Sequence, residues 1–333
     1  MAVLSQTAIA PPVTRTMRAS VITGPGQVEV EHVVIPEPGP GEVRLRMEGC
    51  GVCGSNLSLW EGHSWFEYPS SAGAPGHEGW GVIDAVGSGV SSLTPGDRVT
   101  ALSYRAFSEY DIAAADAVVP LPASLANTPF PGEPLGCAVN AFRRSGIYPG
   151  QTVAIIGIGF LGALLTRLSY LGGARVIAIS RRPFALAVAK RLGAEISLPL
   201  EDRGSLTEQV RQLTGGKGVD TAIEAVGLEG PLNLAAELTR IRGRLVIAGY
   251  HQGGSRQVNL QLWNWRGLDV INAHERDPAV YLEGIREAVN LVLSGALDPA
   301  PLYTHRFALD RLDEAFATMQ ERPDGYLKAL VLP

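Results

Sequence analysis

Residues 17–119 contain short apolar runs separated by turn-forming residues. Pro and Gly cluster between the runs, as in Pro38-Gly39-Pro40-Gly41 and Pro95-Gly96-Asp97. Apolar runs bounded in this way are typical of strands in an antiparallel sheet. We therefore predict a mostly antiparallel, barrel-like domain, with strands at residues 19–22, 28–34, 42–47 and 81–86.

Near Pro134 the hydrophobic pattern changes to apolar strands that alternate with helices. Strands separated by helices of this length form right-handed βαβ crossovers and a parallel sheet. After the last helix, residues 303–309 and 326–332 are again strand-like, and we expect them to return to the first domain. The predicted strands are residues 152–157, 175–180, 218–224 and 244–249, and the predicted helices are residues 139–145, 160–171, 184–192, 206–213, 232–239 and 279–294.

Composition narrows the class of protein. The chain has 333 residues, enough for two domains that each bury a core. Its net charge of −5, without a basic block, argues against nucleic acid or an anionic membrane as a partner. Its apolar stretches are far shorter than the ~20 residues of a membrane span. Residues 1–16 are predicted to form a loose tail without the features of a secretory signal, so we expect a cytoplasmic protein.

A glycine-rich motif follows the strand predicted at residues 152–157. It reads Gly157-Ile158-Gly159-Phe160-Leu161-Gly162 and opens a predicted helix. In this context the first Gly makes a tight turn, the second lets a pyrophosphate approach the backbone, and the third lets helix and strand pack closely. The N–H groups and dipole at the helix N-terminus favour the diphosphate charge. We predict a dinucleotide site rather than a turn without ligand, with further contacts from Val226 and Gly249.

The end of the next strand indicates which dinucleotide binds. An NAD site usually has Asp or Glu about 20 residues after the motif, to hold the ribose 2′-hydroxyl. Here the strand ends in Ser180, followed by Arg181 and Arg182. A hydroxyl and two guanidinium groups suit a 2′-phosphate, which a carboxylate would repel. We predict NADP(H) in preference to NAD(H); the alternative is that the arginines only begin a solvated helix.

The chain has three cysteines, Cys50, Cys53 and Cys137. Three thiols cannot form a disulfide framework or a four-thiolate zinc site, but a catalytic metal site needs only about three mixed ligands. The Gly-flanked pair His77-Glu78 and the later Glu133 offer the other donors, and Cys137 follows Glu133 by one helical turn. Thiolate, imidazole and carboxylate are the donors of catalytic Zn²⁺ sites.

Five motifs occur along the chain: Cys-Gly-Val-Cys-Gly-Ser-Asn (50–56), Gly-His-Glu-Gly-Trp-Gly (76–81), Gly-Asp-Arg-Val (96–99), Glu-Pro-Leu (133–135) and Gly-Ile-Gly-Phe-Leu-Gly (157–162). Together they resemble the zinc-dependent medium-chain alcohol dehydrogenases, and the Glu-Pro-Leu motif is most similar to the polyol and threonine dehydrogenase branch. The resemblance implies an α/β fold. A GroES-like, mostly-β catalytic domain would span residues 1–134 and 276–333, and a doubly wound Rossmann domain for the cofactor would span residues 135–275.

The resemblance also assigns zinc ligands. Cys53, rather than Cys50, matches the cysteine ligand of the family, and Cys50 is expected to be structural. Glu78 matches a glutamate that ligates directly or exchanges with water. The third position is a glutamate in the polyol branch and matches Glu133, with Cys137 as the second choice. The zinc ligands implied are Cys53, His77, Glu78 and Glu133.

Ser55 matches the family residue that contacts the substrate oxygen and starts the proton relay, so the catalytic residues expected are Ser55, Cys53 and His77. Two neighbours depart from the family pattern. Asn56 stands where most members have an Asp that supports the ligand histidine, and Ser58 replaces the histidine that ends the relay. The proton must therefore leave by another route, such as water or His63. The lobe with four cysteines that binds structural zinc is missing, so one catalytic zinc is expected.

These features predict a zinc-dependent oxidoreductase that transfers hydride between NADP(H) and a secondary alcohol, polyol or ketone. Zn²⁺ would polarise the substrate oxygen and the nicotinamide would exchange the hydride. The alternatives are a zinc-independent quinone or enoyl reductase of the same fold and a non-catalytic NADP-binding sensor. The resemblance implies a homodimer or homotetramer, with the strand near residues 268–272 as the candidate contact. Candidate wall residues of the substrate cleft are Trp60, Trp65, Tyr104, Phe107 and His274.

Overall fold

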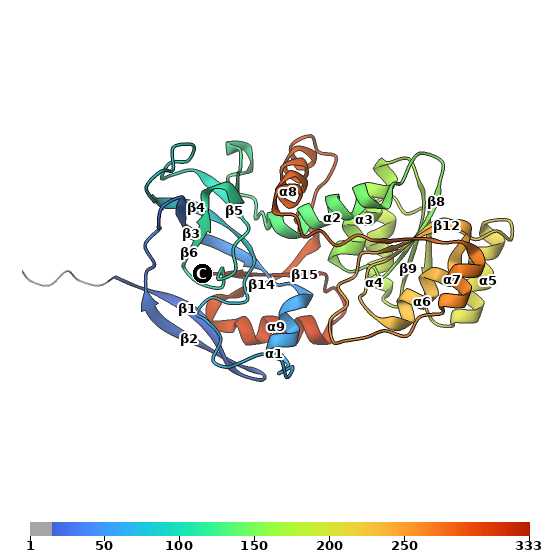
Figure 1. The fold of residues 1–333 in the computed structure, drawn as a ribbon, viewed down its shortest axis with the longest axis horizontal. Coiled ribbons are helices and arrows are strands. Elements are labelled where there is room, and N and C mark those ends of the chain that lie inside the picture. Colours follow the sequence, from blue (N-terminus) through green and yellow to red (C-terminus); the bar gives the residue numbers. More distant parts are fainter. Residues whose placement is uncertain (1–14) are drawn as a thin grey trace, which may run out of the picture.

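The computed structural model describes residues 15–333, and the predicted loose tail lies almost entirely outside them. A six-stranded parallel sheet forms one end of the molecule (Figure 1). Its strand order, β10-β9-β8-β11-β12-β13, is that of a doubly wound dinucleotide-binding sheet. The prediction of a parallel sheet is thereby confirmed. In chain order its strands are β8 (Thr152–Ile156), β9 (Arg175–Ser180), β10 (Ile196–Pro199), β11 (Val219–Glu224), β12 (Thr239–Ile247) and β13 (Asp269–Asn272).

Helices cover both faces of this sheet, which explains why its central strands are almost continuously apolar. Along β8, Val153 and Ile155 face one core, and Ala154 and Ile156 face the other. The first core is shared with α2 (Gly132–Ser145), α3 (Phe160–Leu171), α4 (Pro183–Arg191) and α8 (Pro278–Leu293), and the second with α5 (Arg203–Leu213), α6 (Glu229–Leu238) and α7 (Leu260–Arg266).

A seven-stranded, mainly antiparallel sheet forms the other end of the molecule (Figure 1). The C-terminal strand β15 pairs with β3, so residues from both ends of the sequence build this sheet. The helices α1 (Leu57–Trp60) and α9 (Leu312–Glu321) lie beside it. The sheet contains β3 (Glu42–Gly51), β4 (Glu78–Val86), β5 (Arg98–Ala101), β6 (Tyr110–Ala114), β7 (Val118–Pro120), β14 (Tyr303–Ala308) and β15 (Lys328–Leu332), and β1 (Thr16–Gly24) and β2 (Gln27–Val34) form a separate hairpin.

Helix α2 begins seven residues earlier than predicted. Pro134 lies in its first turn, where the missing N–H has no intrahelical partner to lose. The earlier start places Glu133 and Cys137 on the same helix, one turn apart. The helices α1, α7 and α9 were not predicted. Within residues 15–333, no helix is both long and apolar enough to cross a membrane. The domain boundaries at residues 134, 135, 275 and 276 stay a prediction.

Candidate active site

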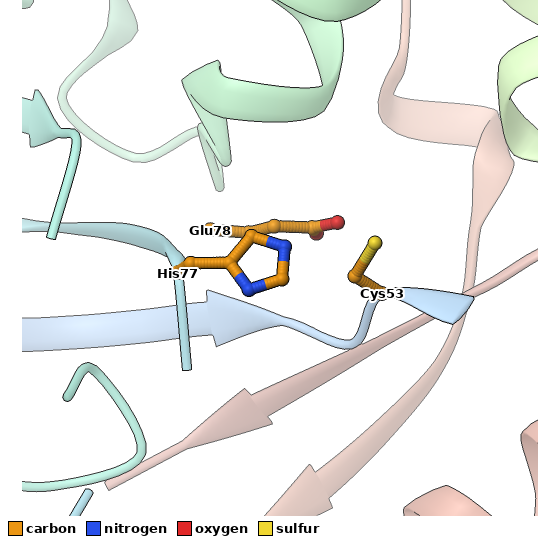
Figure 2. A group of neighbouring side chains, drawn as sticks. All are labelled: Cys53, His77 and Glu78. Carbon is orange, nitrogen blue, oxygen red and sulfur yellow. The ribbon is translucent and has the colours of Figure 1, made fainter. Parts of the chain in front are cut away.

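Three potential metal ligands lie together where β3 ends and β4 begins. One ligand atom from each of Cys53, His77 and Glu78 lies within 4.8 Å of the other two, and the side chains point toward one another (Figure 2). Cys53 follows β3 in the chain, His77 directly precedes β4, and Glu78 is the first residue of β4. A thiol, an imidazole and a carboxylate at this spacing match the donor set of a catalytic Zn²⁺ site. The residues present therefore fit this metal.

Backbone contacts orient the ligand side chains. His77 Nδ1 lies 2.9 Å from the Pro75 carbonyl oxygen; donation of its proton there leaves Nε2 free as a donor to metal. Asn56 donates from Nδ2 to the same carbonyl at 3.1 Å and accepts the Cys53 N–H at 2.9 Å. The Pro75 carbonyl thus accepts the His77 hydrogen bond that the carboxylate of an Asp would accept in most of the family. Asn56 connects the segment that carries Cys53 to the segment that carries His77.

Acidic side chains surround His77, so the electrostatic potential at the site is strongly negative. Burial by itself lowers the pKa of His77, but the Cys53 sulfur and the carboxylates of Glu133 and Glu78 raise it to about 10. An imidazole surrounded by acidic groups retains a proton because the positive charge is favourable there. The same field favours a divalent cation at this position.

Sequence reasoning missed Lys328, which forms a buried ion pair with Glu78. The Lys328 ammonium donates to Glu78 Oε1 at 2.6 Å and to the Val52 carbonyl at 2.9 Å. Burial would lower the pKa of Lys328, but the Glu78 carboxylate and the Cys53 sulfur hold it above its usual value. The available signal was a single Lys within the apolar strand β15, since a buried Lys needs a partner.

Glu133 and Cys137 lie beside the three ligands but do not belong to that group. Both are on α2, where the Cys137 sulfur lies 3.5 Å from Glu133 Oε1. The hydroxyl of Tyr281, from α8, donates to Glu133 Oε1 and lies 2.6 Å from the Cys137 sulfur. Burial raises the pKa of Glu133, as does the nearby Glu78 charge. Tyr281 was also missed, because its contact with Glu133 spans 148 positions of the sequence.

The segment that carries Ser55 contacts the other half of the molecule. Gln252, which follows β12, donates from Nε2 to the Ser55 carbonyl at 3.2 Å. Ser58 is buried and donates to the same carbonyl. The His63 side chain lies 3.3 Å from the Glu61 carboxylate, and its backbone N–H donates to the Ser58 carbonyl at 3.1 Å.

The candidate wall residues have different surroundings. Phe107 is fully buried and packs edge-on against Phe316, so it belongs to the core. Trp60 packs against the same core, Trp65 and Tyr104 are exposed, and His274 stacks on Tyr250 at 5.5 Å.

The glycine-rich motif lies at the carboxyl end of β8, beside the point where the strand order reverses. Gly157 has φ +95°, and a Cβ there would lie 2.3 Å from Val226 Cγ2. A Cβ at Gly162 would lie 2.0 Å from the Gly157 carbonyl oxygen, whereas a Cβ at Gly159 would meet nothing within 4 Å. Gly157 and Gly162 are therefore required by the fold, and Gly159 leaves free space at the N-terminus of α3. Phe160 and Leu161 begin this helix.

Glu224 connects the loops after β11 and β12. Its Oε1 accepts the N–H groups of Val226 and Gly227 at 2.6 and 2.7 Å, and Oε2 lies 3.0 Å from His251 Nε2. A Cβ at Gly249 would lie 2.2 Å from the Gly227 nitrogen. Val226 and Gly249 thus lie at the same edge of the sheet as the glycine motif, where doubly wound sheets bind dinucleotides.

The arginines after β9 have different environments. Arg181 is exposed. Arg182 donates through Nη1 to the Tyr326 carbonyl at 2.5 Å and through Nη2 to the Ile158 carbonyl at 3.1 Å. Its backbone N–H donates to Ser180 Oγ at 3.3 Å. Arg182 therefore connects the glycine motif to the C-terminal segment by hydrogen bonds. The Arg181 side chain, in contrast, remains accessible to a ligand.

Comparison with known proteins agrees with this arrangement. Residues 39–123 match the alcohol dehydrogenase GroES-like domain, and residues 157–290 match the zinc-binding dehydrogenase family. Human (Homo sapiens) sorbitol dehydrogenase is 30% identical over 341 residues, covering 90% of this chain and 92% of that protein. An alcohol dehydrogenase from Cupriavidus necator is 26% identical, covering 96% of this chain and all of that protein.

Solved structures show the same fold. A Sinorhizobium meliloti protein described as a zinc-binding dehydrogenase, solved with NADP bound, superposes with a TM-score of 0.82 at 27% identity, over 96% of this chain and 100% of that one. The 2R,3R-butanediol dehydrogenase of Bacillus subtilis has a TM-score of 0.82 at 25% identity, over 95% and 99% of the two chains. The predicted GroES-like and Rossmann domains are thereby confirmed as the fold class, and the chain is an alcohol dehydrogenase that belongs to the polyol dehydrogenase branch of the zinc-type medium-chain dehydrogenases.

Proposed function

We propose that the protein is a zinc-dependent dehydrogenase that transfers hydride between NADP(H) and a secondary alcohol, a polyol or the corresponding ketone. The observation that carries the proposal is the group formed by Cys53, His77 and Glu78, whose donor atoms lie within 4.8 Å of one another. Three protein ligands of mixed type leave a position for substrate, as catalytic zinc sites require.

Cys53, His77 and Glu78 would hold the zinc ion, with Glu133 as a second carboxylate nearby. Bound zinc supplies Lewis-acid stabilisation of negative charge on the substrate oxygen. Ser55 would transfer the hydroxyl proton. Lys328 would hold Glu78 in place, because its ammonium is already bonded to that carboxylate.

The glycine motif with Val226 and Gly249 would bind the nicotinamide dinucleotide at the carboxyl edge of the parallel sheet. We infer a preference for NADP(H), because β9 ends in Ser180 and is followed directly by Arg181 and Arg182 instead of a carboxylate. The Sinorhizobium meliloti relative was solved with NADP, which supports the same choice.

The relatives act on alcohols according to their names, among them sorbitol and 2R,3R-butanediol dehydrogenases. Both named substrates carry adjacent hydroxyl groups. We therefore propose a small alcohol or polyol, or its ketone, as the substrate class.

Metal analysis with a substrate panel tests the proposal. We expect about one zinc per purified chain, loss of activity on chelation, and a higher kcat/KM with NADPH than with NADH. Less than about 0.2 zinc per chain, with activity on quinones or enones surviving chelation, would assign the protein to zinc-independent reductases instead. Tight NADPH binding without turnover of any alcohol or carbonyl would indicate a sensor.

We also propose that two copies associate through β13. This strand is the edge of the parallel sheet, and Val270 on it is exposed. An unpaired edge offers backbone groups to a second chain. Val270→Pro removes an N–H that points away from β12, because the N–H groups of the alternate residues, such as Ala273, face β12. This substitution is expected to shift the molecular mass in solution to that of a monomer, and an unchanged mass would place the contact elsewhere.

A further inference from the structure

Tyr281 is the stronger of two side-chain donors to Glu133 Oε1 among residues 15–333. The other neighbour of this oxygen is the weak thiol donor of Cys137 at 3.5 Å. A tyrosine hydroxyl ordinarily keeps its proton at neutral pH, so the contact is a donated hydrogen bond. Tyr281 therefore acts on Glu133 as a fixed donor.

The packing of α8 on α2 fixes the position of this donor. A Cβ at Gly136 would lie 2.5 Å from Ile285 Cγ1, and a Cβ at Gly284 would lie 2.6 Å from Asn140. Asn140 also donates to the Val280 carbonyl at 3.2 Å. These close contacts lie one to two turns from Tyr281 and Glu133, and they fix the position of the two helices relative to each other.

Glu133 is close to the metal ligands without being one of the three. Its charge contributes to the raised pKa of His77, yet its oxygens lie outside the group in which all ligand atoms are within 4.8 Å. A hydrogen bond donated to Oε1 occupies one lone pair of that oxygen and fixes the direction in which the carboxylate points. The Glu133 carboxylate therefore has two possible partners, the Tyr281 hydroxyl and the metal.

We propose that Tyr281 is a positioning residue that holds the Glu133 carboxylate away from the metal and so keeps one coordination position open for the substrate oxygen. The inference rests on the proposed zinc-dependent function. It assigns Glu133 the role of a nearby carboxylate instead of a permanent ligand. Without the hydroxyl, the buried carboxylate would lose its main hydrogen bond and would move to the cation.

Co²⁺ binding to metal-free protein tests this inference independently of activity. Tyr281→Phe keeps the ring and removes the hydroxyl. We expect Y281F to bind Co²⁺ about tenfold more tightly, because Glu133 becomes an additional ligand; supporting residues change metal affinity on this scale, although their loss normally weakens binding. We also expect a visible ligand-field spectrum that differs from that of the wild type, and a fall in kcat larger than any change in KM, because the open position becomes occupied.

Two controls isolate the contact. In Y281F/E133Q the gain in Co²⁺ affinity should vanish, because the side chain that moves has lost its charge. Tyr303→Phe is the matched substitution, because the buried Tyr303 hydroxyl has no hydrogen-bond partner among residues 15–333; it should leave Co²⁺ binding unchanged. If Y281F does not fold, E133Q alone should keep the wild-type spectrum, since Glu133 is not a ligand, and a changed spectrum would overturn the inference.

The remaining outcomes separate the two proposals. Equal or weaker Co²⁺ binding by Y281F overturns the role of Tyr281 and leaves the zinc site intact. Absence of Co²⁺ binding by the wild-type protein overturns both the zinc site and the role of Tyr281.

Discussion

Lys328 and Glu78 form an ion pair that is buried on both sides, with 4% and 0% of the two residues exposed. The pair joins the last strand of the chain to the first residue of β4, where the proposed metal ligands meet. Glu78 is therefore held by a permanent cation while it also faces the metal position. Loss of either partner would leave a buried charge without compensation.

Replacement of Lys328 by Met should lower the free energy of unfolding of the metal-free protein by about 3–5 kcal/mol, the usual loss when one partner of a buried ion pair is removed. Added Zn²⁺ should restore part of this loss, because the metal supplies positive charge to Glu78. Chemical denaturation with and without Zn²⁺ measures both effects. Lys190→Met, at an exposed position, is the control and should change little. Equal destabilisation by both substitutions would contradict the prediction.

Metal binding should depend on pH through His77. Its pKa in the metal-free protein is raised from 6.5 to about 10, so the proton stabilises the folded state below pH 6.5 and this stabilisation is lost as the pH rises through about 10. A metal at Nε2 must displace that proton. Apparent Co²⁺ affinity should therefore rise with pH across this interval, with proton release detectable by calorimetry in buffers of different ionisation enthalpy. A flat affinity profile would show that His77 is already neutral at pH 7.

The alternation of strands and helices was sufficient to predict the parallel sheet. Strands such as β8 and β9 are apolar on both faces, and Gly and turn residues mark their ends, so local pattern and tertiary position agree. The predicted start of α2 at residue 139 is too late, because Pro134 lies in the first turn, where a proline is compatible with a helix. The helix α9 has no side-chain N-cap bond, so the usual signal for a helix start was missing.

The site was predictable only in part. Cys53, His77 and Glu78 lie in short motifs near strand ends, and family resemblance was needed to select them. Lys328 and Tyr281 belong to no motif: they reach Glu78 and Glu133 across 250 and 148 positions of the sequence. Such contacts follow from how β15 pairs with β3 and how α8 packs on α2, which no local pattern encodes.

The two arginines after β9 should respond differently to replacement. Arg181→Ala should raise KM for NADPH about tenfold, consistent with loss of one charge-assisted bond of ~1.5 kcal/mol, without changing stability. Arg182→Ala should also lower the melting temperature, because Arg182 bonds the carbonyls of Ile158 and Tyr326. Kinetics with NADPH and NADH, together with thermal unfolding, separate these effects. Arg191→Ala, at an exposed position, is the control. An equal rise in KM for NADH and NADPH in R181A would argue against a 2′-phosphate contact.

Glycine substitutions should separate cofactor binding from folding. Gly159→Ala adds a Cβ that meets nothing within 4 Å, so the melting temperature should stay unchanged, while KM for NADPH should rise because the methyl group occupies the space a pyrophosphate needs. Gly162→Ala places a Cβ 2.0 Å from the Gly157 carbonyl oxygen and should destabilise the fold by about 1–3 kcal/mol. Gly230→Ala, also in open space, should change neither property. Unaltered NADPH binding by G159A would mean that the diphosphate does not approach this turn.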